Sequence, residues 1–251
     1  MSSRRSPIAE LVVVLPVLAA LSGCGASAAP EASATASPDP TEAAVRAVDT
    51  PDCLPGAARA VVAGSEADPT IVVTIGEGSR GIVFAPQLGA TFCQWADQLV
   101  RYADQGYRVA SFAWGEDGGA SLEATVGVLR GEGAEDVALV GASKGAGVVA
   151  ALADDLRPAP VGVIALSPGV EVEGHDATSA GSAYTGPLLV VASETDGSIR
   201  ASESQQVARA DDPATYVQLP GSAHGVAILL AGTGPQVLDQ MDGFLAAAFG
   251  G

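Results

Sequence analysis

Two kinds of apolar pattern alternate along the chain from residue 57 onward. Short apolar runs rich in β-branched residues predict strands, and longer stretches with apolar residues at helical spacing predict helices. The predicted strands cover residues 58–64, 70–75, 81–86, 107–114, 136–142, 161–166, 187–193 and 214–219. The predicted helices lie near residues 91–105, 118–131, 144–156, 200–210 and 224–248.

Several of the predicted strands, such as "DVALVGA" and "VGVIAL", are apolar almost throughout instead of alternating. This pattern is typical of strands in a parallel sheet that is covered by helices on both faces. The alternation of strands and helices therefore predicts an α/β fold with a doubly wound, mostly parallel eight-stranded sheet and helices on both faces.

The first residues have the pattern of an export signal. Arg4 and Arg5 precede a mostly apolar stretch over residues 7–20, which ends at the small residues of "LSGC". The stretch is too short for a membrane span, which needs about 20 apolar residues. "LSGC" resembles the lipobox of bacterial lipoproteins, and an ordinary signal peptide that contains a cysteine is the alternative.

The lipobox resemblance implies a lipoprotein signal peptide over residues 1–23 and lipid attachment at Cys24. The chain would then be exported and anchored to the outward face of the cell membrane of a bacterium. Residues 24–50 are mostly Ala, Ser, Thr, Pro and Glu, which predicts a disordered tether. Residues 51–251 remain for one domain with a sizeable core.

The net charge and the cysteines limit which binding partners, disulfides and metal sites are expected. A formal net charge of −17 argues against nucleic acid as a partner and against electrostatic adhesion to anionic lipid. Cys53 and Cys93 are the cysteines beyond the export signal, and in an oxidising compartment they form either a disulfide or two unpaired thiols. No metal-ligand spacing surrounds either cysteine, so neither a metal nor a cofactor is expected.

The run "LVGASKGAGVVAAL" places Ser143 between a predicted strand and a predicted helix. The pentapeptide from Gly141 to Gly145 has the G-x-S-x-G pattern of a nucleophile elbow, in which the glycines let neighbouring elements approach a strained serine. Ser143 would lie at a helix N-terminus, where N–H groups stabilise a developing oxyanion. Lys144 raises the possibility of a Ser-Lys dyad, but the side chain after an elbow serine is expected to leave the site.

A serine nucleophile needs a base that is oriented by a carboxylate. The chain has two histidines. His224 follows the last predicted strand and is the candidate base, whereas His175 lies on a polar loop and is expected at the surface.

The carboxylate should follow a sheet strand between the serine and the histidine. Asp196 follows the buried strand "PLLVVAS" and is the first choice, with Glu194 second. Glu171 and Glu173, which follow the preceding strand, are weaker candidates.

The order Ser143, Asp196, His224 and the loop "PGSAHG" resemble the α/β-hydrolase superfamily over about residues 57–249. The resemblance implies a Ser-His-Asp triad and an oxyanion hole made by the backbone N–H groups of Lys144 and Leu88. "PQLG" stands where relatives have H-G-x-G, so Gln87 is the alternative to Leu88.

Residues 167–186 are few and polar, so a helical cap domain does not fit between the strands on either side. The resemblance is therefore to compact, cap-less, esterase-like and dienelactone-hydrolase-like members. An open site with few aromatic residues favours carboxylic esters with short or polar groups. A peptidase, a thioesterase, an acyltransferase and a non-catalytic envelope binding lipoprotein are the alternatives.

Overall fold

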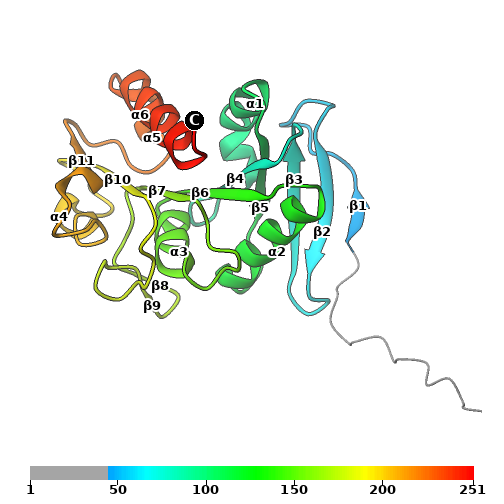
Figure 1. Ribbon diagram of the computed structural model, residues 1–251, viewed down its shortest axis with the longest axis horizontal. Coiled ribbons are helices and arrows are strands. Elements are labelled where there is room, and N and C mark those ends of the chain that lie inside the picture. The colour runs from blue at the N-terminus through cyan, green and yellow to red at the C-terminus, as the bar shows by residue number, and fades with distance from the viewer. Residues whose placement is uncertain (1–44) are drawn as a thin grey trace, which may run out of the picture. The chain divides into compact units, whose positions relative to one another are not determined.

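The computed structural model describes residues 45–251, and its main sheet has nine strands in the order β1-β2-β3-β5-β4-β6-β7-β10-β11 (Figure 1). These strands are β1 Arg46–Val48, β2 Arg59–Gly64, β3 Pro69–Ile75, β4 Arg80–Ala85, β5 Arg108–Ala113, β6 Asp136–Ala142, β7 Gly162–Leu166, β10 Leu188–Ser193 and β11 Tyr216–Leu219. A separate antiparallel hairpin consists of β8 Glu171–Val172 and β9 His175–Asp176.

The sheet is mixed but mostly parallel. The pairings β5–β4, β4–β6, β6–β7, β7–β10 and β10–β11 are parallel. The pairings that join β1, β2, β3 and β5 are antiparallel. The predicted α/β class with a mostly parallel sheet is therefore confirmed.

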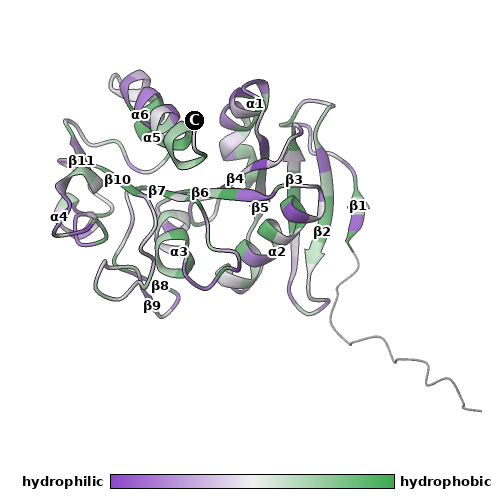
Figure 2. Ribbon diagram, in the orientation of Figure 1, coloured by the Kyte–Doolittle hydropathy of each residue, from purple (hydrophilic) through white to green (hydrophobic). Residues whose placement is uncertain are grey.

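Helices cover both faces of this sheet (Figure 1). They are α1 Ala96–Asp104, α2 Gly118–Gly131, α3 Lys144–Leu152, α4 Ala201–Ser204, α5 Ala227–Leu230 and α6 Gly234–Ala248, with 3-10 turns at Phe92–Trp95 and Pro213–Thr215. One buried cluster contains residues of α1, α5 and α6, and a second contains residues of α2 and α3. The middle strands, such as β6 and β7, are consequently apolar along most of their length (Figure 2).

The N-terminal boundary of the domain differs from the prediction. Arg46–Val48 pairs with β2 as an antiparallel edge strand, and the Thr50 hydroxyl donates to the carbonyl oxygen of Ala58 at 3.0 Å. The predicted tether therefore extends too far, and the sheet has nine strands instead of eight. Backbone pairing forms this strand without burying its side chains, so no apolar pattern marks it. Residues 1–23, Cys24 and the tether up to residue 44 lie outside the described residues.

Three predicted helices are shorter than the pattern suggested, and one of them, expected over 144–156, ends at Leu152. The helix expected over 200–210 ends at Ser204, and the one expected over 224–248 divides into α5 and α6. The break has a local cause, because Pro235 lies in the first turn of α6 and a side chain at Gly234 would collide with the backbone of Leu229. Within residues 45–251, no helix has the length and apolar character that a membrane crossing requires.

Candidate active site

Ser143 lies at the turn from β6 into α3, in a strained backbone conformation with φ 52° and ψ −114°. Such a conformation costs about 1–3 kcal/mol for a non-glycine residue. The flanking glycines are required by close packing, since a Cβ on Gly141 would collide with the carbonyl of Gly145, and one on Gly145 with that of Ala85. The backbone N–H of Ser143 donates to Leu166 at the end of β7, at 2.9 Å.

Asp196 and His224 lie in the loops that follow β10 and β11, and their side chains are within ion-pair distance. The distance between Asp196 Oδ2 and His224 Nδ1 is 2.7 Å, and the carboxylate side chain is fully buried. Its other oxygen accepts hydrogen bonds from the backbone N–H groups of Ser198 at 2.8 Å and Ile199 at 3.3 Å. The contact at Nδ1 leaves Nε2 of His224 as the nitrogen that can act as a base.

Burial alone would raise the pKa of Asp196. The hydrogen bonds from His224, from the two backbone N–H groups and from the Ser167 hydroxyl outweigh burial and hold the pKa of Asp196 below its ordinary value of 3.8. The carboxylate is therefore charged at neutral pH and can stabilise an imidazolium.

Leu166 and Ser167, two consecutive residues, connect the serine turn to the histidine loop. Leu166 accepts from the backbone N–H of Ser143, while the buried Ser167 hydroxyl accepts from that of Gly225 at 3.1 Å. Ser167 itself has a positive φ of 51°. No hydrogen bond joins Ser143 Oγ to His224 among the described residues, so the two loops are linked through Ser167 and not directly.

Gln87 makes a second connection to the histidine loop. Its side-chain oxygen accepts from the backbone N–H of Val226 at 3.0 Å and from Gln94 Nε2 at 2.6 Å. Its own backbone N–H donates to Gln94 Oε1 at 2.9 Å and is therefore occupied. By contrast, neither the N–H of Leu88 nor that of Lys144 donates to any acceptor within residues 45–251. Of the two alternatives for the oxyanion donor, Leu88 is the one with a free N–H.

Ser143, Leu88 and Lys144 border an open cleft of about 360 Å³, and Asp196 and His224 are not among its lining residues. The side chains and backbone that line it include Leu88, Ser143, Lys144, Val172, Glu173 and Ile199. The Lys144 ammonium turns toward Glu173 and the ring of Trp114, so its charge is already paired.

Among the described residues, none of the other candidate carboxylates pairs with His224. Glu194, Glu171 and Glu173 make no hydrogen bond or ion pair with His224, and His175 is exposed on β9. Across the part of the chain that is described, no group of three or more His, Cys, Asp or Glu side chains is arranged to hold a metal ion.

Cys53 and Cys93 form a disulfide, with their Cα atoms 5.7 Å apart. Of the two arrangements that the sequence left open, the structure has the disulfide.

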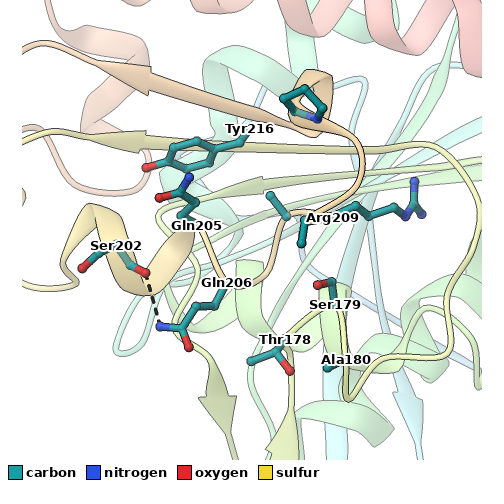
Figure 3. Close-up of a pocket in the computed structure, with 11 residues that line it drawn as sticks. Thr178, Ser179, Ala180, Ser202, Gln205, Gln206, Arg209 and Tyr216 are labelled. Carbon is teal, nitrogen blue, oxygen red and sulfur yellow. Dashed lines mark hydrogen bonds between the residues drawn. The ribbon is translucent and has the colours of Figure 1, made fainter.

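A larger depression of about 610 Å³ lies elsewhere, beside α4 and Tyr216 (Figure 3). Hydroxyl and amide side chains such as Ser179, Gln205 and Gln206 border it, and Gln206 Nε2 donates to the carbonyl of Ser202 at 3.2 Å. Arg209 also lines this depression, and its guanidinium donates to the backbone carbonyls of Tyr184 and Gly186. No nucleophile and base occur together among its lining residues, so the Ser143 cleft is the candidate active site.

The sequence does not predict the side-chain contacts of Ser167, Gln87 and Gln94, and it suggests Gln87 only as an alternative backbone donor. Ser167 follows a strand that is apolar throughout, and Gln87 follows one that is apolar after Arg80, both at the carboxyl edge where ligands bind in open α/β sheets. That position was the available signal.

No family model and no curated protein matches the sequence. Solved structures do match. An esterase from Pyrococcus furiosus superposes with a TM-score of 0.63 at 14% identity, over 82% of this chain and 98% of that one. A thermophilic esterase from Thermogutta terrifontis superposes with a TM-score of 0.60 at 13% identity, over 75% of this chain and 98% of that one. Est1E from Butyrivibrio proteoclasticus superposes with a TM-score of 0.58 at 14% identity, over 76% of this chain and 99% of that one. These likenesses, with the strand order above, show an α/β-hydrolase fold.

Proposed function

We propose that this protein is a serine hydrolase that cleaves carboxylic esters with short or polar groups. The observation that carries the proposal is the turn at Ser143, where a strained serine at the head of α3 faces an open cleft beside two unused backbone N–H groups. A glycine-rich turn with no chemical role has no reason to hold a serine in this conformation. The esterases among the structural neighbours agree with the proposal.

The mechanism follows from the positions of the groups. His224 takes the proton of the Ser143 hydroxyl as its oxygen attacks the ester carbonyl, and Asp196 stabilises the imidazolium that forms. The N–H groups of Leu88 and Lys144 bind the oxyanion of the tetrahedral intermediate. His224 then protonates the leaving alcohol, and water releases the acyl group by the same steps. The hydrogen bond between Ser143 Oγ and His224 would form once substrate binds, since catalytic hydrogen bonds are often completed only in the complex.

The size of the cleft supports small substrates. Its volume of about 360 Å³ is at the lower end for ligand pockets, and only the β8–β9 hairpin and its flanking loops lie between β7 and β10. A cleft of this size would enclose only part of a long acyl chain. For the whole chain, we infer export and lipid anchoring through Cys24 on the evidence of the "LSGC" tetrad.

A fluorophosphonate probe tests the proposal. The purified protein should be labelled at Ser143, as mapped by mass spectrometry, and should hydrolyse p-nitrophenyl acetate. Ser143→Ala should abolish labelling, and His224→Ala should lower kcat by about 10³-fold or more. His175→Ala is the matched control, because it removes the other histidine from an exposed position outside the cleft. A folded wild-type protein that is neither labelled nor active would overturn the proposal.

A further inference from the structure

The β8–β9 hairpin forms one wall of the Ser143 cleft, through Glu171, Val172 and Glu173. Each of its strands has two residues, and the two strands pair with each other but with no strand of the main sheet. An isolated two-stranded hairpin is marginally stable at best. Contacts with the rest of the domain must therefore hold this wall in place.

Glu173 supplies the polar contacts. It occupies the turn of the hairpin with a positive φ of 50°. One carboxylate oxygen is 2.5 Å from Lys144 Nζ, and the other accepts from the backbone N–H of Gly118, at the start of α2, at 2.8 Å. The positive end of the helix favours the negative charge. A side chain at Gly118 would displace this carboxylate from its present position.

Lys144 is the partner on the other side, and it is the single lysine of the chain. Its side chain is only 13% exposed, so water screens this ion pair less than it screens a surface pair. Its Nζ lies 4.2 Å from the centroid of the Trp114 ring, and Trp114 Nε1 donates to the backbone oxygen of Gln87 at 3.2 Å. Lys144 therefore connects the hairpin to the loop that carries Leu88.

We propose that Lys144 and Glu173 determine substrate size, because their ion pair holds the β8–β9 hairpin as a fixed wall of the Ser143 cleft. The inference rests on the proposed ester hydrolysis and adds a role that the triad does not supply. The backbone N–H of Lys144 serves the oxyanion, whereas its side chain sets the width of the cleft. Without the pair, Val172 and the hairpin turn move away from α3, and larger esters enter.

Glu173→Gln and Lys144→Met test the proposal. The first keeps the shape of the side chain and removes its charge, and the second removes the ammonium but leaves the backbone N–H. The readout is kcat/KM for p-nitrophenyl esters from acetyl to octanoyl and for a matching series of alkyl acetates. In at least one series, both variants should raise the preference for the longer over the shorter ester by about ten-fold.

Glu132→Gln is the matched control. It weakens ion pairs with Arg59 and Arg108 at the opposite end of α2, away from every residue that lines the cleft. Its dependence of kcat/KM on ester length should equal that of the wild-type protein. Unchanged profiles in both Glu173→Gln and Lys144→Met would overturn the proposal.

A second readout does not depend on ester hydrolysis. Since the chain has a single lysine, an amine-reactive reagent gives one modified side chain, Lys144, which mass spectrometry separates from any label at the N-terminal amine. Labelling should be faster in Glu173→Gln than in the wild type, and an equal rate would show that no pair holds the hairpin. If the wild-type protein hydrolyses no ester, the proposed function and the size role both fail, while faster labelling of the variant would still establish the ion pair.

Discussion

Backbone strain at single residues is concentrated around the cleft. Among residues 45–251, three non-glycine residues have a positive φ: Ser143, Ser167 and Glu173. One carries the candidate nucleophile, one accepts a hydrogen bond from the histidine loop, and one holds the hairpin. Each such conformation costs about 1–3 kcal/mol and persists only where its surroundings enforce it. The coincidence supports a functional reason for all three.

The elbow glycines give a prediction at this scale. Gly145→Ala should lower the free energy of unfolding by about 1–3 kcal/mol, because its new Cβ meets the rigid backbone at Ala85 and Pro86. It should also lower kcat, since the turn that holds Ser143 must shift.

Gly127→Ala is its matched control, as Gly127 is exposed in the middle of α2 with open space around it. It should stabilise the protein by about 0.5–1 kcal/mol without loss of activity. Urea denaturation and steady-state kinetics measure both effects. Equal responses of the two variants would contradict the packing argument.

At the scale of elements, the sheet assembles the site. Gln87, Ser143, Ser167, Asp196 and His224 follow β4, β6, β7, β10 and β11, which are neighbouring parallel strands. Since parallel strands end at the same edge, residues far apart in sequence meet there. The disulfide adds a further tie, because Cys93 lies in the 3-10 turn that follows the loop of Gln87 and Leu88.

Loss of this disulfide should destabilise the domain. The bridge joins residues separated by 40 positions, and a closed loop of that size is worth about 4 kcal/mol in the chain-entropy account. The Cys53→Ser, Cys93→Ser double variant should show this loss in urea denaturation, and reduction of the wild-type protein should give a similar midpoint. A double variant as stable as the oxidised wild type would contradict the expectation.

For the whole molecule, the net charge bears on the proposed lipid anchor. A net charge of −17 repels anionic lipid, so the surface of the protein offers no general electrostatic hold on a membrane. Attachment would then depend on the lipid that "LSGC" implies at Cys24.

Substitution of Cys24 tests this dependence. In bacterial cells, the wild-type protein should sediment with membranes, and Cys24→Ser should appear in the soluble fraction. The Cys53→Ser, Cys93→Ser variant keeps Cys24, so the protein that accumulates in the cells should sediment with the membranes. A Cys24→Ser protein that stays membrane-bound to the wild-type extent would exclude the lipid anchor.

The sequence by itself determined the α/β class, the positions of most strands and the elbow at Ser143. These features depend on local patterns, namely apolar periodicity and a strand–turn–helix junction with glycines at fixed spacing. The edge strand β1 was missed, because its exposed side chains leave no periodic signal.

Only the tertiary structure decided which distant groups meet. It paired His224 with Asp196, although Glu194 follows the same strand, and it joined Cys53 to Cys93. It also placed Ser167 and Gln87 against the histidine loop, and Glu173 on Lys144. These contacts join residues 28 to 139 positions apart, so strand order, and not local sequence, sets them.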